Sequence, residues 1–162
     1  MSGRIDWADF VCGSGIAERK KLNIDAFEQT YLTVARHIFM NFERPNAQRW
    51  MNAFMEAERA FPAPFGATIA HAISVAIHEM RMCRTNTFSY FNTDDPVAPV
   101  SVTKEERYFV SVLQDIRGGD TASAKLNALL LCEGGDAGAF LGAVERIAII
   151  TGDVKDPQLQ TT

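Results

Sequence analysis

Helix-capping residues recur along this sequence at spacings that leave room for little but helices. Asp25 stands three residues before Glu28, and Thr103 stands three residues before Glu106. In each pair the two side chains can satisfy each other's free backbone amide, which is the capping box of a helix start. Both pairs are followed by apolar residues at intervals of three and four, the repeat of a helix with one buried face. The sequence therefore predicts amphipathic helices that begin at these two points.

Prolines indicate where the early helices end. Pro45 ends the first helix, expected over residues 25–43, because proline disfavours a helical conformation in the residue before it. Apolar residues then continue at helical spacing until a Pro-Ala-Pro break at 62–64. An alanine-rich stretch follows, which predicts another helix over about 66–84.

Glycine-glycine-aspartate turns divide the last third of the chain. They stand at 118–120 and 134–136. Glycine reaches the left-handed conformation that ends a helix, and aspartate accepts from the free amides that begin the next one. Two such turns predict three consecutive antiparallel helices. Their aliphatic side chains, Leu126, Leu129 and Leu130 among them, are expected to join the aromatic faces of the first helices in one core.

We therefore expect an all-α, single-domain bundle of five main helices, with a short amino-terminal helix near residues 6–11. Helices in 1–84 and a three-helix group in 101–152 flank a loop at 85–100, and a tail follows at 153–162. The chain has 162 residues, of which 47% are hydrophobic. A chain of this length buries roughly 70% of its unfolded surface, so it needs no metal or disulfide to fold.

The loop at 85–100, called the aromatic loop below, interrupts the helical pattern with Phe88, Tyr90 and Phe91. Loops of this length are commonly functional or disordered. Its aromatic side chains have two interpretations. They cover the junction between the two helical groups, or they form a lid that binds a partner, with Arg81 and Arg84 beside them to bind planar or anionic groups.

The helix before this loop carries two histidines on one side. His71 and His78 are seven residues apart, which is nearly two turns, so their imidazoles are expected about 10.5 Å apart along the axis. Ser74 lies between them, and Arg81 follows on the same face. This polar strip either lines a cleft, where the imidazoles bind an anion or transfer protons, or is simply a solvent-facing side of the helix.

The sequence contains no motif typical of an enzyme active site. None of the three histidines follows a glutamate by three residues, which excludes the di-iron bundle signature. Zinc spacings, a phosphate-binding loop and a Gly-x-Ser-x-Gly elbow are also missing from the sequence. We therefore assign no catalytic residue, no metal ligand and no cofactor.

Cysteine and charge content bear on compartment and partners. Cys12, Cys83 and Cys132 are an odd number without a Cys-x-x-Cys pair, which favours free thiols in a reducing, cytoplasmic environment. No apolar run reaches the ~20 residues needed to cross a bilayer. Residues 85–162 hold six basic and eleven acidic side chains, a net charge of −5, which argues against nucleic-acid binding.

These observations favour a non-enzymatic intracellular protein that works by protein–protein interaction, with a partner or with itself, in a regulatory or assembly role. The alternative is a small-molecule binding protein or enzyme. Its pocket would lie between the helix of His71 and His78 and the aromatic loop at 85–100.

Overall fold

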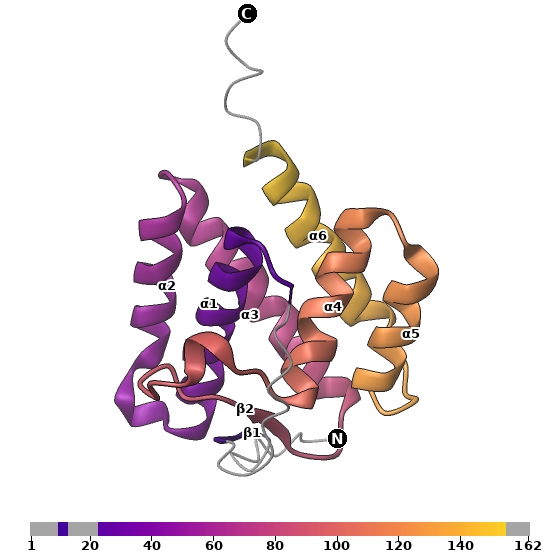
Figure 1. Cartoon of the computed structure of the whole chain (residues 1–162), viewed down its shortest axis with the longest axis horizontal. Helices are drawn as coiled ribbons and strands as arrows, with labels where there is room; N and C mark the ends of the chain where they lie inside the picture. The colour runs from indigo at the N-terminus through magenta and orange to yellow at the C-terminus, as the bar shows by residue number, and fades with distance from the viewer. Residues whose placement is uncertain (1–9, 13–22, 155–162) are drawn as a thin grey trace, which may run out of the picture.

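The structure, a computed structural model, describes residues 10–12 and 23–154. Six α-helices and two short strands occupy this part of the chain (Figure 1). Their order is β1 (Phe10–Cys12), α1 (Ala26–Glu43), α2 (Arg49–Ala60), α3 (Phe65–Cys83), β2 (Phe88–Tyr90), α4 (Lys104–Gly118), α5 (Thr121–Leu131) and α6 (Gly138–Val154), with single 3-10 turns at Pro45–Ala47 and Ala98–Val100. The all-α, single-domain fold is confirmed, with six main helices rather than five among the described residues.

The helix ends form as their residues predict. The Glu28 amide donates to Asp25 Oδ1 at 2.8 Å, and the Asp25 amide donates to Glu28 Oε2 at 2.9 Å. Thr103 and Glu106 make the same reciprocal pair at the start of α4. After α4, Gly119 adopts a φ of +79°, the left-handed conformation that closes a helix. Local hydrogen bonding thus sets these boundaries.

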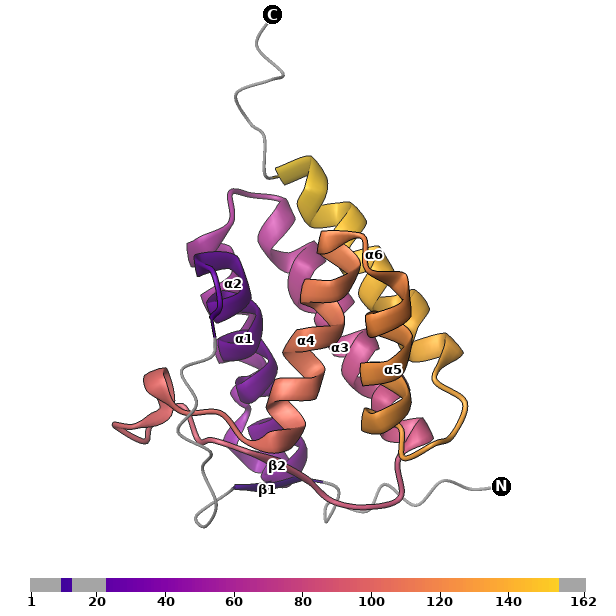
Figure 2. The ribbon, with the colours of Figure 1, turned by 45° about the vertical axis from the view of Figure 1, so that its right-hand side comes forward.

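The helices pack around one core. α1 packs on α2, α2 packs on α3, and α4 packs closely on α5 (Figures 1 and 2). α6 packs more extensively on α3 than on its neighbour α5. Its buried face carries Phe140, Val144 and Ile147, which join the core cluster shared with the other helices. α6 thus connects the last three helices with the helices that precede the aromatic loop.

Residues 10–12 form a strand instead of part of the expected amino-terminal helix. β1 pairs in parallel with β2, and Phe10 lies opposite Phe88. A helix of one or two turns is unstable alone, whereas an extended segment beside β2 finds backbone partners at once. The rest of the expected helix lies outside the described residues.

The aromatic loop is packed into the core. Phe88 and Tyr90 are buried, and the ring of Phe88 lies 4.6 Å from that of Phe39 and 6.3 Å from that of Phe109, between centroids. Phe91 is also buried. These contacts support the interpretation that the loop covers the junction between helices, because an exposed aromatic lid would leave the rings in solvent.

A buried ion pair holds the aromatic loop in place. Arg36 in α1 and Glu106 in α4 are 2% and 0% exposed and form two parallel hydrogen bonds of 2.7 and 2.9 Å. Arg36 also donates to the carbonyl oxygens of Ala98 and Ser101, each at 2.7 Å. Glu106 accepts from the backbone amide of Phe91 at 3.1 Å. One pair of side chains thus connects two helices with the loop between them.

We expect the variant Arg36→Met to lower the free energy of unfolding by about 3–5 kcal/mol, because it leaves the Glu106 carboxylate buried without a cation. Urea denaturation of both proteins measures the difference. Arg146→Met, on the exposed face of α6, is the matched control and should change stability by less than about 0.5 kcal/mol. Equal losses in the two variants would contradict a structural role for the pair.

The cysteines depart from the sequence-based expectation. Cys83, at the end of α3, and Cys132, just after α5, are joined by a disulfide that spans 49 residues, with their Cα atoms 5.2 Å apart. Sequence spacing could not show this pairing, since it depends on two helix ends meeting in space. The prediction of three free thiols is therefore wrong for this pair, and the cytoplasmic assignment loses its argument from cysteine content.

Reduction of this disulfide should destabilise the protein. A closed loop of this length restricts the unfolded chain by an amount worth about 4 kcal/mol in the chain-entropy account. We expect urea denaturation with a strong reductant to show a loss of up to about that size. The double variant Cys83→Ser/Cys132→Ser should be insensitive to reductant. A thiol assay of the denatured, unreduced wild type that finds three reactive thiols rather than one would refute the bond.

Candidate functional site

Among the described residues, the two histidines of α3 border neither of the two clefts presented below. His71 and His78 both lie on the exposed outer face of the helix, and Ser74 between them is tied to its own backbone by a 2.9 Å hydrogen bond to the Ala70 carbonyl. The prediction that they share one face is consistent with the structure, but this face is the solvent-facing side of the helix.

The two arginines that precede the aromatic loop are used within the fold. The Arg81 guanidinium lies over the Phe42 ring at 4.0 Å from its centroid. Arg84 donates to the Leu131 carbonyl at 2.5 Å and forms an ion pair with Glu133 at 3.5 Å. Burial lowers the pKa of Arg84, although the Glu133 charge opposes that shift. Both side chains serve to join helices in this structure.

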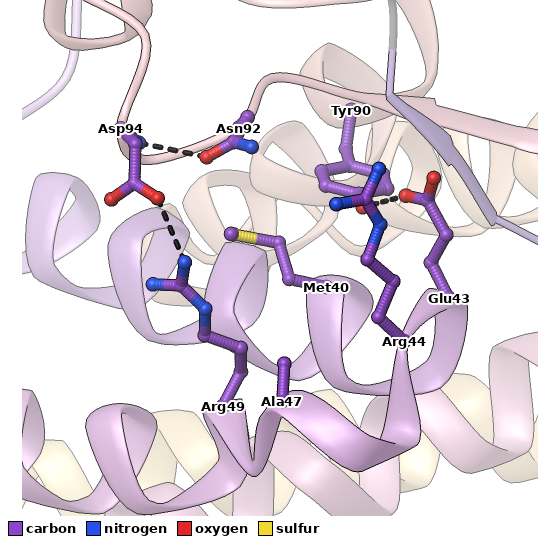
Figure 3. Close-up of a pocket in the computed structure, with 8 residues that line it drawn as sticks. All are labelled: Met40, Glu43, Arg44, Ala47, Arg49, Tyr90, Asn92 and Asp94. Carbon is purple, nitrogen blue, oxygen red and sulfur yellow. Dashed lines mark hydrogen bonds and ion pairs between the residues drawn. The ribbon is translucent and has the colours of Figure 1, made fainter.

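Of the eight binding residues predicted from sequence, Tyr90 and Arg84 border clefts. Tyr90 lines a pocket at the carboxyl end of α1, called the α1-end pocket (Figure 3). Its volume is about 200 Å³. It is lined by residues from α1, from the start of α2 and from the aromatic loop, namely Met40, Glu43, Arg44, Ala47, Arg49, Tyr90, Asn92 and Asp94.

Two polar pairs form the sides of the α1-end pocket. The Tyr90 hydroxyl donates a short hydrogen bond to Glu43 Oε2. Across the pocket, Arg49 forms a 2.8 Å ion pair with Asp94 (Figure 3). Asn92 Oδ1 accepts from the Asp94 amide at 2.8 Å, which leaves the Asn92 amino group available as a donor.

Two charges in this pocket have no counter-ion in the described part of the chain. The Arg44 side chain is exposed and makes no hydrogen bond or ion pair with the described residues. Glu43 is hydrogen-bonded to the Tyr90 hydroxyl but has no cation within ion-pair distance among the described residues. The pocket therefore presents one unpaired cation and one unpaired anion around a floor that includes the buried Met40 side chain.

His37 lies near the ion pair of this pocket. Burial lowers its pKa, the Arg49 charge lowers it further, and Asp94 acts in the opposite direction. Its Nδ1 atom is buried without a hydrogen-bond partner within the described residues. Burial and the Arg49 charge thus both favour the neutral imidazole, against the Glu56 and Asp94 charges.

A second cleft lies between the carboxyl end of α5, the start of α4 and residues 84–87, and it is called the α5 cleft. Its volume is about 260 Å³. Leu130 and Tyr108 supply apolar surface, and Glu133 and Lys104 supply charge. Glu133 adopts a φ of +57°, unusual for a residue with a side chain. Its carboxylate accepts from the amides of residues 85 and 86.

In α5, which borders this cleft, the small apolar side chains are buried and the large ones are exposed. α5 buries Ala124 and Ala128, which are 1% and 0% exposed. Its leucines point outward, with Leu126, Leu129 and Leu130 57%, 44% and 48% exposed. The expectation that these leucines join the core is wrong. α5 packs closely on α4, and close approach of two helices favours small side chains between them.

Sequence reasoning missed most of the α1-end pocket. Glu43, Arg44 and Arg49 flank the Pro45 break, and Asp94 belongs to an acidic pair in the aromatic loop. The one signal available was this concentration of charge at a helix end followed by a loop. Nothing in the local pattern shows that the two segments meet.

Comparison with protein-family models, curated proteins and solved structures finds no match for this chain. Among the described residues, no group of three or more histidine, cysteine or acidic side chains is placed to hold a metal ion. No helix in that part of the chain is long and apolar enough to cross a membrane. The function must therefore be inferred from the surfaces and pockets themselves.

The Glu133 interactions predict a dependence of stability on pH. Burial opposes the shift, but the hydrogen bonds from Thr85 and Asn86 outweigh it and lower the pKa of Glu133 to about 2, from 4.5. A lowered pKa stabilises the fold above the unfolded value and loses that effect as pH falls through the folded value. The wild type should therefore melt above Glu133→Gln at neutral pH, and the gap should shrink between pH 4.5 and about 2. A constant gap would contradict this.

Proposed function

We propose that this protein works by association with protein, in the first place with a second copy of itself, through the outer face of α5, rather than by catalysing a reaction. The observation that carries this proposal is the burial pattern of α5, which buries alanines and exposes Leu126, Leu129 and Leu130. A helix with apolar side chains on more than its core-facing side usually has a second surface packed against it. Among the described residues, the outer row of α5 leucines is half exposed.

The three leucines form a patch rather than isolated exposed residues. They stand at positions i, i+3 and i+4, so they lie on one face of the helix. Single exposed apolar side chains are normal on protein surfaces, whereas contiguous ones commonly mark interaction sites. Full burial of one leucine is worth roughly 1.5–3 kcal/mol, so covering the half-exposed row supplies a real driving force.

Charges at the two ends of this face favour a second copy as the occupant. Lys125 precedes the leucine row and Glu133 follows it. If two α5 helices pack antiparallel about Leu129, Lys125 of one copy comes near the end of the other copy's α5. Glu133 lies there, two residues beyond Leu131, where its carboxylate is already held by the amides of residues 85 and 86. The contact is thus self-complementary, as a two-fold symmetric interface requires.

The α5 cleft supports the same arrangement. Glu105 and Glu133 place two carboxylates at its lining, and Leu130 and Tyr108 add apolar surface. A lysine side chain buries its methylene groups against apolar surface while its ammonium group stays near water or a carboxylate. Lys125 of the second copy could therefore place its methylene groups against Leu130 and Tyr108 and its ammonium group near these carboxylates.

We expect sedimentation equilibrium from micromolar to millimolar concentration to show reversible dimers of the wild type. Leu129→Lys should be monomeric over the same range, because two like charges would meet at the symmetry axis. The control is Ile149→Lys, which changes another exposed apolar residue, on α6, and should leave the association unchanged.

A wild type that stays monomeric throughout overturns self-association. Dimers that dissociate in Ile149→Lys but persist in Leu129→Lys overturn the assignment to α5. If the wild type is monomeric, a protein of different sequence could still bind the outer face of α5. That alternative requires its binding to be lost in Leu129→Lys.

A further inference from the structure

We propose that the α1-end pocket binds a small zwitterion, a molecule with one carboxylate and one ammonium group, such as a free α-amino acid. This site lies at the junction of α1, α2 and the aromatic loop (Figure 3), apart from the α5 face. Its ligand would be recognised by the two unpaired charges of opposite sign, Arg44 and Glu43.

The size of the pocket limits the ligand. Sites for drug-sized molecules usually measure roughly 300–1,000 Å³, and the α1-end pocket measures about 200 Å³. A nucleotide or a folded peptide segment is too large for this space. A ligand of a few non-hydrogen atoms fits, and its affinity must come from charge and hydrogen bonds because it can bury little apolar area.

The donor groups of the pocket suit a carboxylate. The Arg44 guanidinium is a planar group with several donors, which binds a carboxylate through two parallel hydrogen bonds. The amino group of Asn92 is a further donor on this lining. Arg49 supplies less, because Asp94 already engages its guanidinium at 2.8 Å. A free carboxylate would therefore bind Arg44 and Asn92.

The Glu43 carboxylate suits an ammonium group. The Tyr90 hydroxyl donates to one oxygen of Glu43, and the second oxygen accepts no hydrogen bond from the described residues. An ammonium group placed there would satisfy that oxygen and neutralise the Glu43 charge. The charges of Arg44, Arg49, Glu43 and Asp94 sum to zero, so a ligand with zero net charge leaves the pocket balanced, whereas a simple anion or cation does not.

Three matched probes test this proposal by NMR. L-alanine carries both charged groups, propionate lacks the ammonium group, and ethylamine lacks the carboxylate. With the ¹⁵N-labelled full chain, we expect saturable shifts of the backbone amides of Arg44, Arg49, Asn92 and Asp94 on addition of L-alanine. Propionate and ethylamine should each bind at least about tenfold more weakly than L-alanine, since each loses one set of charged hydrogen bonds.

Two variants identify the residues responsible. Arg44→Ala and Glu43→Gln should each weaken L-alanine binding by about tenfold or more. Arg44 is exposed, and glutamine at position 43 can still accept from the Tyr90 hydroxyl, so both variants retain the fold. The matched controls are Arg146→Ala and Glu145→Gln on the exposed side of α6, which should leave binding unchanged.

Three other outcomes of the NMR titrations would overturn the proposal. Propionate that binds as tightly as L-alanine indicates a site for anions, and ethylamine that does so indicates a site for cations. Absence of a saturable shift with L-alanine removes the site altogether. Because Leu129→Lys leaves the α1-end pocket intact, these results are independent of the association through α5.

Discussion

The buried pair of Arg36 and Glu106 is the interaction on which the arrangement of the aromatic loop depends. An irregular segment cannot enter a protein interior unless its backbone groups find partners. Arg36 donates to two carbonyl oxygens of the segment that precedes α4, and Glu106 accepts from the amides of Phe91 and Thr103. With these groups satisfied, the aromatic rings can pack against α1 and α4.

The same pair determines where the candidate pocket lies. It anchors the aromatic loop on either side of Asn92 and Asp94, so that these residues lie above the carboxyl end of α1 (Figure 3). Arg49 then reaches Asp94, and Tyr90 reaches Glu43. The pocket is therefore a product of long-range packing, although each of its side chains comes from an ordinary helix end or loop.

The sequence was most informative where structure is determined by neighbours along the chain. Asp25 with Glu28, and Thr103 with Glu106, act over three residues, and the helices begin where these pairs indicate. Glu106 shows the limit of such reasoning. It was recognised as a capping residue, but its ion pair with a residue 70 positions earlier leaves no local trace. The disulfide and the parallel pairing of β1 with β2 were missed for the same reason.

Periodicity also failed to show which apolar face of a helix is inward. On α3 it placed His71 and His78 together, but it could not show that their face is open to solvent. On α5 alanines and leucines both recur at helical spacing, and the larger residues were expected to be buried. The structure selects Ala124 and Ala128 because α4 lies close by. This choice depends on the distance between helices, which no single segment encodes.

The bond between Cys83 and Cys132 has a consequence for how copies of this chain can meet. It closes a covalent ring that contains α4 and α5. Proteins with a long connecting segment can exchange whole elements between molecules, each completing the other's core. The disulfide opposes such an exchange of α4 or α5, because it ties both ends of the segment that contains them to each other within one chain. Any oxidised assembly formed through them must consist of fully folded molecules in lateral contact, and it can come apart without unfolding.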